Sequence, residues 1–173
     1  MSAAIIGLLL PAKGNSPRQI AIVTAIAVLV VNLILAFQFD FQQESFQFVE
    51  DIAWIEWIGL NYHLGIDGLS FPLVLLNSFL TLIAIFSTNP QIQRPRLYYA
   101  MLLLLSAGAA GAFLAQDLLL FFLFYELEIV PLYFLIAIWG GAKRGYAAMK
   151  FLLYTALSGI LVLASFLGLV WLT

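Results

Sequence analysis

Residues 118–139 read LLLFFLFYELEIVPLYFLIAIW, a stretch long enough to cross a bilayer as one helix. It contains two carboxylates, Glu126 and Glu128, and one proline, Pro131. At about 1.5 Å per residue from Asp117, Glu126 lies roughly 14 Å along the helix, near the centre of a hydrocarbon layer about 30 Å thick. Each acid at that depth costs about 2.5–3.5 kcal/mol, so the pair consumes most of the insertion energy of the apolar residues. Their presence predicts a role other than stability.

The rest of the chain has the same membrane character. Of its 173 residues, 64% are hydrophobic and 9% are charged, whereas average soluble proteins carry about 25% charged residues. Apolar runs predict five transmembrane helices, at about residues 18–38, 68–88, 96–115, 117–139 and 146–172. The opening run, residues 3–10, is too short to span and resembles the end of a truncated helix. We therefore expect an all-α membrane protein, a single polytopic helix bundle with five full helices plus a truncated N-terminal helix.

Basic residues are confined to alternate connections between the predicted helices. They form three clusters, which are Lys13 with Arg18, Arg94 with Arg96, and Lys143 with Arg144 and Lys150. The external loop 39–66 and the turn 116–117 contain none. The positive-inside rule places the basic clusters on the cytoplasmic side and the C-terminus on the opposite side. The two-residue turn makes its flanking helices antiparallel neighbours, and the small-residue run SAGAAGA (106–112) permits close helix approach.

Three polar features outside residues 118–139 predict local structure. Asn32 lies inside the first predicted span and is expected to hydrogen-bond across a helix interface. In the external loop, phenylalanines alternate with polar residues from Phe39 to Phe48, which predicts short extended pieces. Asp67 is expected to act as N-cap of the helix that follows the loop.

The two acids and the proline suggest proton chemistry. Pro131 cannot donate a hydrogen bond to the carbonyl of Leu127, which predicts a helix kink and a released acceptor beside Glu126. Glu126 and Glu128 are about 200° apart around the helix, so they face different neighbours and cannot form a carboxylate pair. Desolvation favours the neutral form of a carboxylic acid, whereas a nearby cation favours the charged form. A carboxylate whose surroundings alternate between these conditions takes up and releases a proton.

Lys150 has two interpretations. It lies near the start of the last predicted helix, where a long cationic side chain can snorkel to the membrane surface. Tyr154 and Ser158 follow at i+4 and i+8, forming a polar line that could instead belong to a proton route.

Other chemistry has little support in the residues. The chain has no Cys, which excludes disulfides and cysteine-ligated iron–sulfur clusters, and its single His, His63, argues against a haem or zinc site. There is neither a phosphate-binding glycine loop nor a nucleophile–base set. We therefore predict no metal and no cofactor bound by this chain, and no nucleic acid partner.

Several motifs resemble a known family. The segments FFLFYELEIVP (121–131), WGGAKR (139–144) and KFLLYT (150–155) resemble the antiporter-like chain 4 subunit of respiratory and photosynthetic complex I. GIDGLS (65–70) and QDLLLFF (116–122) resemble the same family. The double acid and the GGAKR loop are most similar to cyanobacterial and chloroplast members. Because the family's fold is larger, with two inverted five-helix repeats, this chain resembles an N-terminal portion of it.

The resemblance implies a proton-translocating membrane subunit of an NAD(P)H– or ferredoxin–plastoquinone oxidoreductase. Such a subunit contributes to the enzyme as a translocase and carries no redox centre. The complex would use NAD(P)H or ferredoxin, iron–sulfur clusters and plastoquinone or another quinone. Its implied partners are other membrane subunits of complex I and the lipid bilayer. The implied location is a cyanobacterial or chloroplast thylakoid membrane, with the bacterial plasma membrane as alternative.

The resemblance also assigns roles to residues. Glu126, five residues before Pro131, matches the family's essential intramembrane glutamate, and Glu128 is a second, weaker candidate. Lys150 matches a lysine that the family commonly carries at that place. Two alternatives remain: a subunit of a multisubunit cation/proton antiporter, and a structural membrane scaffold in which the acids lock helices together.

Overall fold

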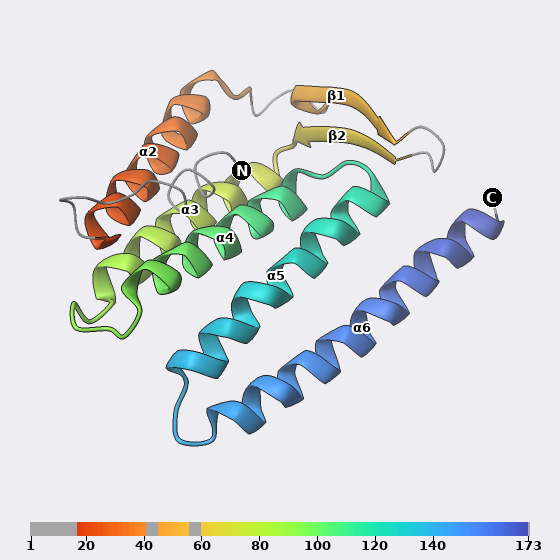
Figure 1. The fold of residues 1–173 in the computed structure, drawn as a ribbon. Coiled ribbons are helices and arrows are strands. Elements are labelled where there is room, and N and C mark those ends of the chain that lie inside the picture. The colour runs from red at the N-terminus through yellow and green to blue at the C-terminus, as the bar shows by residue number, and fades with distance from the viewer. Residues whose placement is uncertain (1–16, 41–44, 56–59, 173) are drawn as a thin grey trace.

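The computed structural model describes residues 17–40, 45–55 and 60–172. These residues form five helices, α2 (Pro17–Gln38), α3 (Ser70–Ser87), α4 (Pro95–Leu114), α5 (Leu118–Trp139) and α6 (Arg144–Leu172) (Figure 1). All five are long and apolar enough to cross a membrane. Their ends lie at most two residues from those expected from the sequence. The expected truncated N-terminal helix, at residues 3–10, lies outside the described residues.

The helices do not share burial equally. Helices α2, α3 and α4 pack against one another, α5 packs on α4, and α6 packs on α5 at the edge of the bundle (Figure 1). The three-helix group has an apolar core formed by Ala21, Ala25, Ile85, Tyr99 and Leu103. Helix α6 is the least covered of the five. Helix α5 therefore lies between a well-packed group and α6, whose main packing among the described residues is on α5.

The external loop contains a β-hairpin. Strands β1 (Gln47–Ile55) and β2 (Leu60–Ile66) pair antiparallel, with Asp51 opposite His63. The prediction of extended pieces in the external loop is confirmed for residues 47–55 and 60–66, while residues 41–44 lie outside the described part of the chain. The all-helical description needs the hairpin as an addition. Strand β2 contacts α4 and α5, and the backbone N–H of Gln116 donates to the carbonyl of His63 at 2.9 Å. The hairpin is therefore fastened to the turn between α4 and α5.

Two aspartates organise helix starts at the hairpin end. Asp117 is the N-cap of α5, since its carboxylate accepts from the N–H groups of Leu119 at 2.8 Å and Leu120 at 3.1 Å. Asp67 caps the start of α3, as expected, although the assigned helix begins at Ser70 and Leu69 already has helical dihedral angles. The Asp67 carboxylate accepts from the N–H groups of Leu69 at 3.2 Å and Ser70 at 2.6 Å, and its backbone carbonyl accepts from the N–H of Phe71 at 3.1 Å. The hydrogen bonds to the carboxylate, above all the one from the backbone of Ser70, lower the pKa of Asp67.

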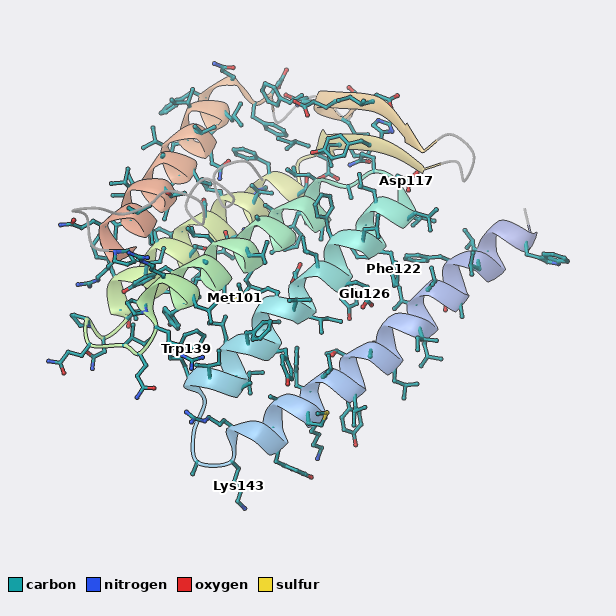
Figure 2. All side chains as sticks on the ribbon, in the orientation of Figure 1. Met101, Asp117, Phe122, Glu126, Trp139 and Lys143 are labelled. Carbon is teal, nitrogen blue, oxygen red and sulfur yellow. The ribbon has the colours of Figure 1, made fainter. Side chains whose placement is uncertain are left out.

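The basic residues that the structure describes lie at the end of the bundle opposite the hairpin. Arg18 Nη2 donates to the carbonyl of Phe86 at 3.1 Å, which joins the start of α2 to the end of α3. Trp139 Nε1 donates to the carbonyl of Gln93 at 2.7 Å, which joins the end of α5 to the α3–α4 connection. Lys143 and Asp117 lie at opposite ends of α5 (Figure 2). Basic residues and hairpin therefore occupy opposite ends, as the positive-inside pattern requires.

Candidate functional site

Helix α5 directs its two carboxylates toward different helices. Glu126 faces α6, where its Oε1 atom fills the space that a Cβ atom on Gly159 would occupy. Glu128 faces α4, where its Cγ atom lies 2.9 Å from the Cβ position of Gly108. The expectation that the acids meet different neighbours is confirmed. They belong to two separate interfaces.

Glu126 is half-buried and lies between α5 and α6 (Figure 2). Its Oε1 atom is buried and has no hydrogen-bond partner among the described residues. Phe121 of α5 and Phe166 of α6 lie across the same interface, with ring centroids 6.4 Å apart. A carboxylate oxygen in this position has acceptor capacity that the surrounding side chains leave unused.

Glu128 lies in the tighter interface with α4. Near it, the ring of Phe124 fills the space that a Cβ atom on Gly111 would occupy. Gly108 and Gly111 therefore let the two helices approach closely enough to enclose both side chains. They belong to the small-residue run whose close approach the sequence predicted. Apolar residues of α5 and the hairpin surround this interface, including Leu120, Tyr62 and Leu64.

The structure does not bring Lys150 to the carboxylates. Its side chain is exposed on α6, with Nζ 5.9 Å from the ring centroid of Tyr146 and 5.7 Å from that of Tyr154. Gly159, which marks the position of Glu126, is nine residues further along α6, about 13.5 Å at 1.5 Å per residue. Of the predicted polar line, Lys150 and Tyr154 are in contact, and the part played by Ser158 stays a prediction. A direct Lys150–Glu126 ion pair is excluded in this conformation.

Pro131 is buried within α5, and the helix continues past it to Trp139. The proline therefore does not end the helix. Because its nitrogen carries no hydrogen, the carbonyl of Leu127 lacks its usual helical donor. Leu127 follows Glu126 directly in the sequence. A free carbonyl and a carboxylate therefore lie next to each other near the middle of α5, as predicted. The size of the expected kink remains a prediction.

Sequence reasoning missed the glycines that make room for the acids. Gly108 was seen only as part of a small-residue run, and Gly159 was not singled out. The available signal was the enrichment of small residues at transmembrane helix interfaces. That signal marks Gly159, which stands beside Ser158 in an otherwise apolar helix, as a contact position.

Comparisons with known proteins agree with this architecture. Residues 115–173, which include all the candidate residues, match the family described as NADH:quinone oxidoreductase/Mrp antiporter, transmembrane. The chain is 51% identical over 127 residues, 73% of its length, to NAD(P)H-quinone oxidoreductase chain 4 of Nostoc sp.. It is 43% identical over 170 residues, 98% of its length, to a chain 4 of Picosynechococcus sp.. The chloroplastic chain 4 of Mesostigma viride is 41% identical over 173 residues, 97% of this chain.

A solved structure supports the fold. The membrane-bound sulfane sulfur reductase, an archaeal respiratory membrane complex, contains a chain that matches with a TM-score of 0.73 and 20% identity. The match covers 91% of this chain and 32% of that chain.

These findings define the class as antiporter-like integral membrane proteins. Within it, the chain is a homologue of chain 4 of the NAD(P)H-quinone oxidoreductases. It spans 24–34% of the length of the three relatives named above.

Proposed function

We propose that this chain is a proton-translocating membrane component of an NAD(P)H– or ferredoxin–plastoquinone oxidoreductase, with Glu126 as the group that carries the proton. One observation supports this most strongly: Glu126 Oε1 is buried at the α5–α6 interface without a hydrogen-bond partner among the described residues. The chain 4 relatives belong by name to quinone-reducing enzymes that use NAD(P)H. Translocation would then be coupled to quinone reduction elsewhere in the complex.

The chemistry at Glu126 is one reversible protonation. When a proton binds Oε1, the carboxylate becomes a neutral acid, and its release restores the negative charge. In a low-dielectric setting the balance responds strongly to a cation that approaches or withdraws. The side of α6 that faces away from α5 is exposed. A partner that packs on that side would be separated from Glu126 only by α6. A cation on such a partner would promote release of the proton.

Glu128 and Lys150 have secondary roles in the proposal. Glu128 lies in the closed α4 interface, so changes outside the bundle reach it less directly than Glu126. Lys150 lies at the basic end of α6, where it would exchange protons with the cytoplasmic side. The roughly 13.5 Å between its helix position and Gly159 requires a relay between them. Neither residue substitutes for Glu126.

The proposed complex would supply the redox chemistry through other subunits. It would use NAD(P)H or ferredoxin, iron–sulfur clusters and plastoquinone, whereas this chain has no Cys to ligate a cluster. Partner membrane subunits would cover apolar side chains of α6, which are exposed at Leu153, Leu157, Ile160, Leu161 and Leu167. Its cyanobacterial and chloroplastic relatives favour a thylakoid location, with the plasma membrane as alternative.

Two other functions follow from specific observations. The matched family also includes Mrp antiporters, which favours a multisubunit cation/proton antiporter as second candidate. Each acid lies against a glycine of a neighbouring helix, which would also suit a scaffold whose acids hold helices together. The three functions differ in whether Glu126 must ionise and in whether transport requires Na⁺.

The deciding experiment is Glu126→Gln in membranes of the native host, with assembly of the complex and donor-driven proton uptake measured together. Glutamine keeps the shape of the side chain but cannot carry the proton, so assembly should persist while uptake falls on the order of a hundredfold. Glu128→Gln is the matched control, with the milder loss expected.

Each outcome has a distinct meaning. Normal assembly with normal uptake in Glu126→Gln would exclude the proposed role. Loss of assembly would favour the scaffold, and uptake that depends on Na⁺ would favour the antiporter. A larger loss of uptake in Glu128→Gln than in Glu126→Gln would reverse the ranking of the acids.

A further inference from the structure

A partly open cavity of about 180 Å³ lies between α2, α3 and α4, away from α6. Helices α2, α3 and α4 supply most of the described lining, while Tyr62 and Leu64 of β2 and Phe124 of α5 complete it. A cavity of this size has room for several water molecules. Empty cavities of comparable size in proteins are apolar, so the polarity of this lining decides what it holds.

The lining is mostly apolar but includes several side chains with neutral hydrogen-bonding groups. These are Thr24, Asn32, Tyr62, Asn77, Ser78, Thr81 and Ser106. Asn77 Nδ2 donates to the carbonyl of Ser106 at 2.9 Å and to its hydroxyl at 3.2 Å, which bridges α3 to α4. Ser78 and Thr81 each donate their hydroxyl to a backbone carbonyl of α3 at 2.8 Å. A hydroxyl used in this way still has an oxygen that can accept a hydrogen bond.

Asn32 is the unsatisfied member of this set. Its side chain is only 9% exposed, and its Nδ2 atom is buried without a hydrogen-bond partner among the described residues. The cross-helix hydrogen bond expected of Asn32 is made by Asn77 instead. Leaving an amide donor unpaired inside a membrane protein is costly, because lipid provides no acceptor. An acceptor inside the cavity removes that cost.

The ligand that fits is neutral. None of the described lining residues is charged, so a metal cation would lose its hydration shell without a carboxylate to compensate. Water both accepts from Asn32 and donates to the hydroxyl oxygens. We propose that this cavity is a hydrated compartment in which Asn32 and Asn77, with the neighbouring hydroxyls, bind a cluster of water molecules.

The compartment is separate from the carboxylates of the proposed proton path. Thr24 and Asn32 are eight residues apart on α2, so the polar lining extends about 12 Å along that helix. Tyr62 and Leu64 place one end of the cavity beneath the hairpin. Phe124 lines the cavity, whereas Glu128, the next residue along that face of α5, is not among the lining residues. The proposal therefore stands or falls independently of proton translocation.

X-ray radiolytic footprinting tests it in the assembled complex purified from membranes. Hydroxyl radicals formed from internal water oxidise the side chains beside that water. Leu103 lines the cavity at 8% exposure, and Ile85 is 0% exposed in the core without lining it. We expect Leu103 and Phe124 to be oxidised on the order of tenfold faster than Ile85, because radicals formed inside the protein do not depend on surface exposure. Equal and slow oxidation of all three would show a dry cavity and overturn the proposal.

A variant tests the role of Asn32. Asn32→Leu keeps a similar volume but removes the unpaired donor, so oxidation of Leu103 should fall several-fold while the complex still assembles. Val28→Leu, on the same helix and also lining the cavity, is the control for added bulk. Unchanged oxidation in Asn32→Leu, or an equal fall in both variants, would show that Asn32 does not hold the water.

Discussion

The two faces of α5 each place a glutamate against a glycine of the neighbouring helix, but the surroundings of the two glutamates differ. On each face a glycine of the neighbouring helix makes room for a glutamate, Gly108 for Glu128 and Gly159 for Glu126. The α4 face is closed by Phe124 and Leu120, which are 6% and 2% exposed, and by the hairpin. The α6 face is supported by a helix whose other sides are largely uncovered.

This difference shows that the tolerance of an interface to an added methyl group depends on which side chain fills the space beside the glycine. At Gly111 this space holds the ring of Phe124, which is 6% exposed and packs with Leu120 on one side while it lines a cavity on the other. At Gly159 it holds the end of a flexible carboxylate. A methyl group added at the first site must displace packed atoms, whereas at the second it needs only a rotation of Glu126. One interface is built for packing and the other tolerates movement.

The largest effect on stability is expected from Gly111→Ala. The added methyl group overlaps the Phe124 ring, and overpacking of this kind costs about 1–3 kcal/mol. The amount of assembled complex and its midpoint of thermal inactivation should both fall. Gly168→Ala, where nothing lies within 4 Å of the Cβ position, is the control and should leave both unchanged. A normal midpoint in Gly111→Ala would mean that the α4 face is no more tightly packed than the α6 face.

A smaller effect on stability, with a larger one on transport, is expected from Gly159→Ala. The methyl group takes the place of Glu126 Oε1 and turns the carboxyl group away, without displacing rigid atoms. Assembly should be nearly normal, while proton uptake falls on the order of tenfold, since proton transfer depends closely on geometry. Uptake and assembly are measured in the same membranes, again against Gly168→Ala. Loss of assembly with unchanged uptake per complex would show that the α6 face does not tolerate movement better than the α4 face.

The smallest effect is expected from Lys150→Gln. The change removes two exposed cation–π contacts, with Tyr146 and Tyr154, each worth about 0.5–1 kcal/mol at such sites. Proton uptake should fall less than in Glu126→Gln, because the lysine does not contact the buried carboxylate. The same uptake assay checks this, with Lys143→Gln as a control for the loss of a nearby basic charge. An uptake loss as large as that of Glu126→Gln would assign Lys150 to the central path.

Much of the fold could be predicted from the sequence because the membrane restricts the choices. A backbone in lipid must satisfy its own hydrogen bonds, so long apolar runs become helices. The apolar run and the lack of basic residues in the turn before it positioned α5 within one residue of its observed start, whereas the Asp117 cap was found only in the structure. The β-hairpin was predicted only as extended pieces, because the register that places Asp51 opposite His63 depends on how the two strands pair and on the helices they pack against.

The candidate site divides in the same way. The sequence by itself determined that Glu126 and Glu128 lie deep in one helix and on different faces, since depth and rotation follow from helical geometry alone. Only the tertiary structure decided which helix each acid meets, that Gly159 holds the space for Glu126, and that Lys150 contacts tyrosines instead. The reason is physical: the neighbours of a side chain depend on how separate helices rotate and pack, and no local pattern in the chain records that arrangement.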